Sequence, residues 1–222
     1  MGDMAEPAVS GLEEVMPDSA GAGSRIPVES VPVGGTVPRR GYGLLRPLGR
    51  WILRRLDWCS EGSFPDQPKL VIAIAPHSSA WDFIIGAAFL YVMGLRVAFI
   101  AKHTLFFWPL GGFMRWLGGI PVDRAQPQDL AGVMAAAFGK REQLWLAITP
   151  EGTRTEGARF KSGFYRIARA AGVPILPVYF NYRRRVTGFL PLVEPGDDVA
   201  AGVEQLRLLL QQHGVRRRKT DQ

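Results

Sequence analysis

The amino-acid sequence predicts an α/β fold with a mostly parallel central sheet flanked by helices. Short apolar runs rich in β-branched residues alternate with longer runs of helical length between residues 70 and 212. The succession of strand, helix and strand favours parallel pairing, because the helix carries the chain back to the end of the sheet where it started. The short runs are apolar throughout, which is typical of strands that are covered on both faces.

Each predicted element follows from its length, its pattern and the residues that bound it. Gly94 and Gly172 end two of the helices, because glycine readily adopts the left-handed conformation found there. Residues 181–195 are expected to continue the sheet as an edge. The predicted strands are 70–75, 96–101, 120–124, 144–149 and 173–180. The predicted helices are 44–58, 82–94, 113–117, 128–141, 162–171 and 198–212.

Composition divides the 222 residues into four segments. Residues 1–38 hold six acidic residues and one arginine without apolar periodicity, so they are predicted to form a disordered acidic tail. Residues 39–60 are predicted to contain an amphipathic interfacial helix, 61–215 the main domain and 216–222 a basic tail. The whole chain carries +7 and the first segment −5, so the remaining residues carry +12. A segment this basic is predicted to bind anionic partners such as lipid headgroups, phosphorylated substrates or nucleic acid.

The helix predicted at 44–58 has two distinct faces. Arg46, Arg50 and Arg54 share one narrow arc at about 100° per residue. This pattern fits a helix lying in a membrane interface, with Trp51 and Trp58 at headgroup depth and the arginines towards phosphates. It fits equally a helix packed on the domain with a solvated arginine face. The apolar residues of the far side are Leu44, Leu45, Leu48, Trp51, Ile52, Leu56 and Trp58.

Several functional classes are excluded by composition. No run reaches the ~18 uncharged apolar residues of a spanning helix. The single cysteine, Cys59, excludes an internal disulfide and is consistent with a reducing compartment. The three histidines (His77, His103 and His213) are scattered at no ligand spacing, so no metal site is predicted.

A histidine and an aspartate stand five residues apart where the strand at 70–75 passes into the next helix. His77 and Asp82 would point about 140° apart if both lay inside one helix. They can meet if His77 lies in the loop and Asp82 in the first turn, with Ser79 as the N-cap. Asp82 could merely cap the helix beside an ordinary loop histidine. The alternative is a His–Asp dyad at the carboxyl end of a strand, where the carboxylate orients a proton-accepting imidazole.

Two further polar clusters, 123–124 and 151–154, follow predicted strands, and Lys161 lies a little further along. Arginine suits phosphate because its guanidinium donates forked, charge-assisted hydrogen bonds. Gly152 leaves room for close backbone approach, and Thr153 adds a hydroxyl donor. Each cluster alone is explained equally well as charged residues exposed to solvent at the end of a strand. The candidate phosphate-binding residues are Arg124, Gly152, Thr153, Arg154 and Lys161.

Four blocks in order span about residues 70–180: His77-Ser-Ser-Ala-Trp-Asp82, Gly119-Ile-Pro-Val-Asp-Arg124, Glu151-Gly-Thr-Arg154 and Val173-Pro-Ile-Leu-Pro177. Together they resemble the blocks of the glycerolipid acyltransferases, which include the bacterial 1-acylglycerol-3-phosphate acyltransferases. The resemblance implies an α/β sheet flanked by helices and makes 61–215 an acyltransferase domain. It implies His77 as general base on the acceptor hydroxyl, with Asp82 as its orienting partner. It also implies an acceptor-phosphate site at Arg124, Glu151, Gly152 and Arg154, and places Pro174 on the acyl-donor side.

The reaction implied by this resemblance is direct transfer of a fatty acyl group from acyl-CoA or acyl carrier protein to a lysophospholipid, 1-acylglycerol-3-phosphate first among them. No cofactor is expected, and the absence of a Gly-x-Ser-x-Gly elbow argues against a serine hydrolase. The alternatives are another acceptor such as a lyso-ornithine lipid, and a non-catalytic basic protein that binds membrane lipid. Nucleic-acid binding rests on charge alone and is not expected. The expected location is cytoplasmic, peripheral on the inner face of the cell membrane.

Overall fold

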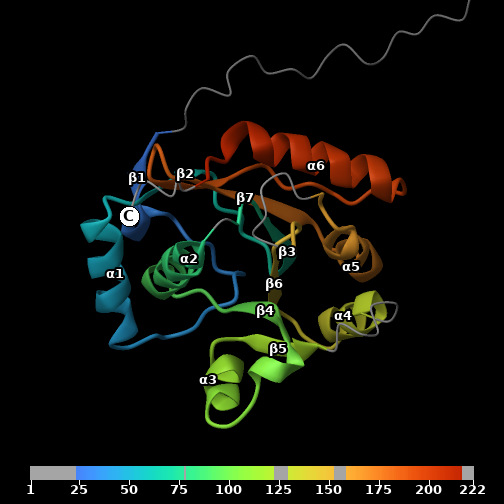
Figure 1. Cartoon of the computed structure of the whole chain (residues 1–222), viewed down its shortest axis with the longest axis horizontal. Coiled ribbons are helices and arrows are strands. Elements are labelled where there is room, and N and C mark those ends of the chain that lie inside the picture. The colour runs from blue at the N-terminus through green and yellow to red at the C-terminus, as the bar shows by residue number, and fades with distance from the viewer. Residues whose placement is uncertain (1–23, 78, 123–129, 153–158, 217–222) are drawn as a thin grey trace, which may run out of the picture.

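One sheet runs through the part of the chain that the computed structural model describes, which is residues 24–77, 79–122, 130–152 and 159–216 (Figure 1). Its strands are β1 (Ile26–Pro27), β2 (Cys59–Gly62), β3 (Lys69–Ile74), β4 (Val97–Lys102), β5 (Gly119–Val122), β6 (Leu144–Ile148), β7 (Ile175–Asn181) and β8 (Val186–Phe189). Across the sheet their order is β1-β2-β8-β7-β3-β6-β4-β5. The two most central strands, β7 and β3, correspond to the predicted runs 173–180 and 70–75.

The centre of the sheet is parallel, as predicted. β3 lies between β6 and β7 and is parallel to both, and β4 and β5 continue the parallel pairing beyond β6. Among the strand pairs in the described residues, β8 against β7 and β1 against β2 are the antiparallel ones. Successive residues of β3 enter different cores, because strand side chains alternate between faces: Val71 packs on one side and Ile72 on the other.

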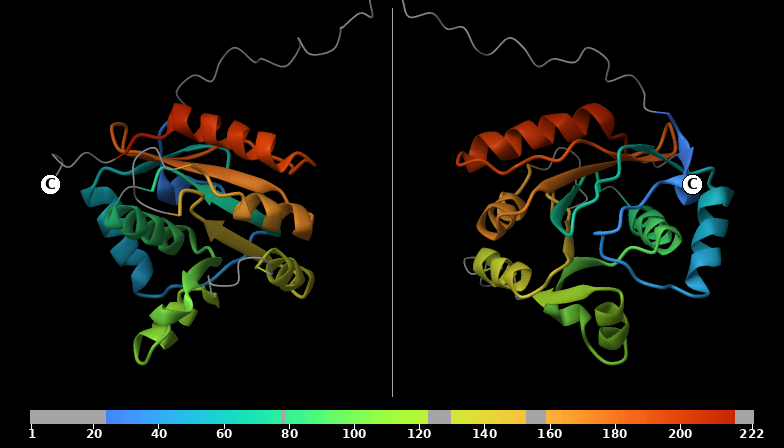
Figure 2. Two further views of the ribbon diagram at one scale, coloured as in Figure 1. Left: turned by 45° about the vertical axis from the view of Figure 1, so that its right-hand side comes forward. Right: turned by 180° about the vertical axis from the view of Figure 1, so that it is seen from behind.

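Helices cover both faces of the sheet (Figures 1 and 2). They are α1 (Leu45–Arg55), α2 (Ala80–Met93), α3 (Leu110–Trp116), α4 (Leu130–Gly139), α5 (Gly163–Ala171) and α6 (Val199–His213). α2 packs on one face, with α1 outside it, whereas α4, α5 and α6 cover the other. α3 lies beyond β5 at one edge. The α/β prediction is therefore confirmed.

The loop between β3 and α2 is fixed by the capping pair that the sequence predicts. Ser79 is the N-cap of α2: its side chain accepts from the Trp81 backbone N–H at 3.2 Å, and the Asp82 carboxylate accepts from the Ser79 N–H at 2.9 Å. Gly94 ends the helix in the left-handed conformation, with φ at 67°. These contacts place His77 in the loop and Asp82 in the first turn, as predicted.

The prediction that residues 181–195 form an edge of the sheet is wrong. β8 lies inside the sheet because β2 pairs with its far side. β2 contains Glu61, which is 2% exposed and accepts hydrogen bonds from Arg184 and from the Tyr179 hydroxyl. Burial and the bond to Glu61 raise the pKa of Tyr179, so this hydroxyl keeps its proton and donates it. A strand anchored by a buried charge has no apolar signature in the sequence.

The predicted disordered tail is too long. Residues 24–38 are part of the folded domain, because Val28, Val31 and Val37 are buried in the core on the α2 side. The N–H of Arg96 donates to the carbonyl of Pro38 at 2.9 Å, which ties this segment to the residues before β4. The rest of the predicted tail, 1–23, lies outside the described residues.

α1 differs from the predicted interfacial helix in two respects. Trp58 lies beyond its end, is 6% exposed and donates its indole N–H to the Thr187 hydroxyl at 2.9 Å, so it cannot reach headgroup depth. Arg50 and Arg54 both pair with Glu29 of the N-terminal segment instead of standing free on a solvated face. In the described parts of the chain, no helix is long and apolar enough to cross a membrane.

Candidate active site

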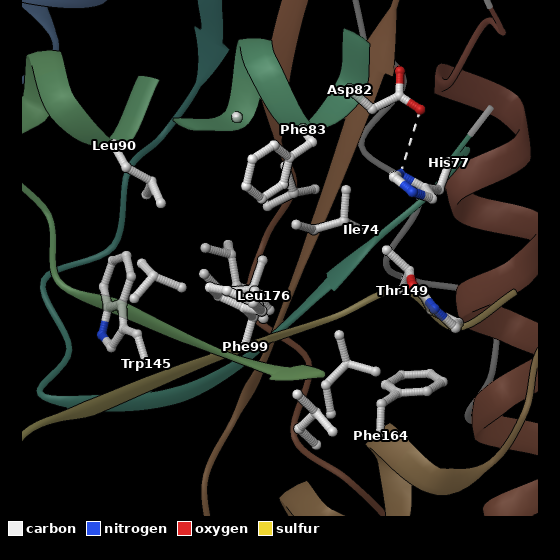
Figure 3. A pocket seen from close by; sticks show the side chains of 18 of the residues that line it. Ile74, His77, Asp82, Phe83, Leu90, Phe99, Trp145, Thr149, Phe164 and Leu176 are labelled. Atoms are coloured by element: carbon white, nitrogen blue, oxygen red, sulfur yellow. Dashed lines mark ion pairs between the residues drawn. The ribbon is translucent and has the colours of Figure 1, made fainter. Parts of the chain in front are cut away.

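His77 and Asp82 face each other at the carboxyl end of β3 (Figure 3). His77 Nδ1 lies 3.4 Å from Asp82 Oδ2, and the two side chains are 22% and 1% exposed. A carboxylate facing Nδ1 favours the tautomer protonated there, which leaves Nε2 as the proton acceptor. A dyad separation slightly longer than a hydrogen bond is usual before a substrate binds. The sequence prediction that these residues meet is confirmed.

Asp82 is held from three sides. Besides His77, its carboxylate accepts from the Ser79 backbone N–H and from the hydroxyl of Tyr182, just past the end of β7. The ring of Tyr182 packs edge-on against Trp58, with 5.1 Å between ring centroids. The buried carboxylate is thus fixed in position by groups from two separate elements, and this fixes the imidazole that it faces.

Glu151 also contacts the dyad loop. Its side chain is 6% exposed; one carboxylate oxygen accepts from the His77 backbone N–H at 3.2 Å and the other from Arg216 at 2.7 Å. The carboxylate is therefore directed at the histidine loop. Sequence reasoning grouped Glu151 with phosphate-binding residues; a buried anion alone would repel a phosphate.

Next to the dyad lies a cavity of about 930 Å³ that is lined by residues of α2, of the sheet and of α4 and α5 (Figure 3). Phe83, Gly86 and Leu90 line it from α2, and Ile74 and Leu176 from the sheet. The dyad lies at one end of the cavity, where His77 is partly exposed, whereas Trp145 lies far from the dyad and is 1% exposed (Figure 3). The volume is at the upper end of the ~300–1,000 Å³ typical of small-molecule sites, and its lining suits an alkyl chain.

A lysine borders the same cavity near the dyad. Gly152 adopts φ +61°, and a Cβ there would lie 3.1 Å from Lys161 Nζ, so the lysine side chain runs across this turn. The backbone N–H of Lys161 donates to the Pro150 carbonyl at 2.9 Å, which holds Lys161 close to the residues that follow β6. Lys161 therefore brings a positive charge to the polar end of an otherwise apolar site.

The structure brings together His77, Asp82, Glu151, Gly152 and Lys161 and separates Pro174 from them. The Pro174 carbonyl accepts from the Val71 N–H at 3.0 Å, at the amino end of β7 and so at the opposite end of the sheet from the dyad. Pro174 does not line the cavity. Arg124, Thr153 and Arg154 lie outside the described residues, so their roles stay predictions. Among the described residues, no group of His, Cys, Asp or Glu side chains could hold a metal ion.

Sequence reasoning missed Tyr182 and Arg216 at this site. Tyr182 stands next to a run of three arginines, and Arg216 opens a basic run at the end of the chain, so both look like surface residues. No spacing rule connects either of them with the dyad, because they reach it through the sheet. Only the arrangement of β3, β7 and the end of α6 brings them there.

Comparison with known proteins agrees with this site and fold. The family model described as Acyltransferase matches residues 61–181, more than half of the chain. The 1-acyl-sn-glycerol-3-phosphate acyltransferase of Salmonella typhimurium is 33% identical over 153 residues, covering 62% of this chain and 61% of that protein. The beta enzyme of that name from Homo sapiens is 32% identical over 116 residues, covering 50% and 41%. This chain therefore spans less than two thirds of the length of these relatives.

A solved structure shares the architecture. The 1-acyl-sn-glycerophosphate acyltransferase of Thermotoga maritima superposes with a TM-score of 0.57 over 76% of each chain at 20% identity, which shows a common fold. The matched family segment contains the dyad, Gly152 and Lys161, which line the polar end of the cavity, and Glu151, which accepts from the His77 backbone N–H. The chain belongs to the acyltransferase family.

Proposed function

We propose that this protein transfers a fatty acyl group from a thioester donor, acyl-CoA or acyl carrier protein, to the free hydroxyl of a lysophospholipid. The observation that carries the proposal is the His77–Asp82 dyad beside an apolar cavity of about 930 Å³. The cavity offers space for an alkyl chain, the dyad offers a base for a hydroxyl, and Lys161 offers a charge for a phosphate. 1-Acylglycerol-3-phosphate combines all three chemical features, and the names of the relatives favour it as acceptor.

The reaction proceeds in one displacement. His77 Nε2 takes the hydroxyl proton of the acceptor as its oxygen attacks the thioester carbonyl. The new C–O ester bond forms, the C–S bond breaks, and the thiolate of the donor leaves and takes up a proton from the imidazolium. Asp82 stabilises the imidazolium between these two transfers, because it is a buried carboxylate facing Nδ1. No covalent acyl-enzyme is required.

The acceptor phosphate is assigned to the cationic rim beside Gly152. Lys161 stands there, and Arg124 and Arg154 are the sequence-predicted arginines of the same site. Because the forked guanidinium recognises phosphate more specifically than a point charge does, the arginines would set the preference for a phosphorylated acceptor. A lyso-ornithine lipid, which has no phosphate, is the alternative that the assay must distinguish.

The test is an acyl-transfer assay on the purified full chain, read by mass spectrometry. Saturated acyl-CoA donors and acyl carrier protein are each combined with lysophosphatidic acid, lysophosphatidylcholine and lyso-ornithine lipid. Diacyl product from lysophosphatidic acid alone supports the proposal, and product from the ornithine lipid alone would replace the acceptor. If no acceptor is acylated while lipid vesicles still bind, the protein is a lipid-binding protein without transferase activity.

Gly86→Leu is expected to shift acyl preference towards shorter chains. A Cβ at Gly86 would meet only Phe180 Cζ, at 4.0 Å, so a larger side chain would extend into the cavity. Removing room for two methylenes should lower kcat/KM for long acyl donors by roughly fifteen-fold, at about 0.8 kcal/mol per methylene. Helix propensity favours leucine over glycine, so α2 should remain folded.

The measurement is kcat/KM across a series of acyl-CoA lengths. Gly139→Leu is the matched control, because Gly139 is also helical, is exposed and has nothing within 4 Å of its Cβ position. It should leave the chain-length profile unchanged. Equal losses for all lengths in Gly86→Leu would contradict the assignment of the acyl chain to this cavity.

We also propose that the protein binds the membrane surface through the outer side of α1. Leu44, Leu48 and Trp51 are 90%, 47% and 65% exposed, and their spacing aligns them on one face. The inner side of the helix packs on α2 through Gly49 and Leu53. An apolar stripe that the domain leaves uncovered, on a basic protein, suits an anionic bilayer.

Trp51→Ala should weaken sedimentation with anionic vesicles by about tenfold, since partial burial of one large apolar side chain contributes about 1.4 kcal/mol. Leu208→Ala is the control, because Leu208 is 48% exposed on α6, away from α1. Binding of the unaltered protein should fall but persist in high salt. If both variants sediment like the parent protein, α1 is not the membrane contact.

A further inference from the structure

The residues after α6 pair with the carboxyl end of β7, next to the dyad. The Val215 N–H donates to the Phe180 carbonyl at 2.9 Å, and the Val215 carbonyl accepts from the Tyr182 N–H at 3.1 Å. Val215 thereby pairs in parallel with Asn181 at the end of β7. Gly214 and Val215 are thus fixed by backbone hydrogen bonds, so Arg216, the first residue of the predicted basic tail 216–222, follows directly on the sheet, and residues 217–222 lie outside the described residues.

This segment lies directly against the loop that carries His77. A Cβ at Gly214 would stand 2.3 Å from Pro76 Cδ and 2.9 Å from the Leu210 carbonyl oxygen, so no larger residue fits there. Pro76 is the residue before His77. Close packing at Gly214 therefore sets where the next two residues enter the active site.

Arg216 enters it as the counter-charge of Glu151. Its guanidinium lies 2.7 Å from Glu151 Oε1, and the two side chains are 23% and 6% exposed. A carboxylate this buried needs a partner to remain charged and oriented. The other oxygen of the same carboxylate accepts the His77 backbone N–H at 3.2 Å. A continuous series of contacts thus runs from Arg216 through Glu151 to the backbone of the dyad histidine.

We propose that Arg216 is a positioning residue of the active site. It holds Glu151 in the orientation that fixes the His77 backbone, and through it the imidazole. The inference rests on the proposed acyl transfer for its kinetic effect, but not for its structural one. Misplacing a reacting group by about 1 Å costs up to ~10²-fold in rate, so a loosened His77 should lower kcat and leave substrate affinity unchanged.

The kinetic test compares three single variants. Arg216→Gln should lower kcat by about tenfold with KM within about twofold of the parent, and Arg216→Lys should recover most of the loss because it keeps the charge. Arg141→Gln removes the charge of an exposed arginine before the amino end of β6, at the opposite end of the sheet from the dyad, and should behave like the parent protein. Melting temperatures are measured for all three variants. If Arg216→Gln does not fold, kcat of Arg216→Lys is compared with that of the parent protein instead. Equal losses in Arg216→Gln and Arg141→Gln would overturn the proposal, since net charge would then explain them.

A double-mutant comparison asks whether Arg216 acts through Glu151. In a Glu151→Gln background, Arg216→Gln should lower kcat by less than about twofold, because the link is already broken. An undiminished tenfold loss in that background would overturn the proposal.

A direct readout needs no turnover. The chain has three histidines, so histidine-selective ¹⁵N labelling gives three backbone amide signals. Arg216→Gln and Glu151→Gln should both shift the His77 signal and leave that of His103 in place. An unmoved His77 signal overturns the inference whatever the kinetics are. A shifted signal in a protein that acylates none of the acceptors would instead refute the proposed function and leave the contact series intact.

Discussion

His77→Ala should abolish acyl transfer while leaving the fold unchanged. A positioned general base contributes ~10²–10⁴ in rate, and no other described histidine approaches Asp82 as His77 does. The His77 side chain lies in a loop and is partly exposed, so its truncation leaves no large cavity in the core. The expected outcome is a kcat at least a hundredfold lower with nearly unchanged KM for the acceptor.

Initial rates with lysophosphatidic acid and acyl-CoA, with a melting curve for each variant, provide the measurement. His103→Ala is the matched control, because His103 is an exposed histidine in the short helix after β4 and does not line the cavity. It should retain the parent rate. Retention of more than about a tenth of that rate by His77→Ala would exclude a base worth ~10² or more.

Asp82→Asn should cause the second-largest loss, about a hundredfold in kcat. The substitution keeps the shape of the side chain and removes the charge that stabilises the imidazolium and selects its tautomer. Tyr182→Phe removes one hydrogen bond to this carboxylate and keeps the ring against Trp58, so its loss should stay below tenfold. Asp82→Asn is expected to cost more than Tyr182→Phe because it removes the negative charge itself, whereas Tyr182→Phe removes only one hydrogen bond that orients the carboxylate.

Asp82 also caps α2, and the experiment must separate that role from the dyad. Ser79→Ala is the control, because it removes the side-chain cap to Trp81 and leaves the His77–Asp82 pair in place. It should lower stability by about 1 kcal/mol with little effect on kcat. If Ser79→Ala and Asp82→Asn lose activity equally, Asp82 is a capping residue alone.

Local sequence determined much of this site. The spacing of Ser79 and Asp82 fixes the start of α2, because a cap is made by residues three apart in one turn. That turn leaves His77 in the loop after a buried strand. The strand itself can be predicted from the sequence because its residues are apolar on both faces. The left-handed glycines at the ends of α2 and α5 were predictable for the same reason: they satisfy a local backbone requirement.

The helix wheel of α1 marks the limit of such reasoning. It distinguishes apolar from charged residues, but it cannot say which apolar side faces protein. Packing on α2 buries Leu53 and leaves Leu44 and Trp51 outside, and Glu29 takes up two of the arginines that the wheel assigns to a free face.

Contacts between distant residues were decided by the tertiary structure alone. Tyr182 meets Asp82 across 100 residues, Arg216 meets Glu151 across 65, and Arg184 meets Glu61 across 123. In each pair at least one member looks like a surface residue in the sequence, because polarity predicts exposure unless a partner is known. The partner is supplied by the order of strands in the sheet, which places the ends of β7, β8 and α6 beside β2 and the dyad loop. The spacing of apolar residues in the sequence predicts which face of a helix or strand is buried. It does not predict buried charges, because these are stable only where the fold brings opposite charges together.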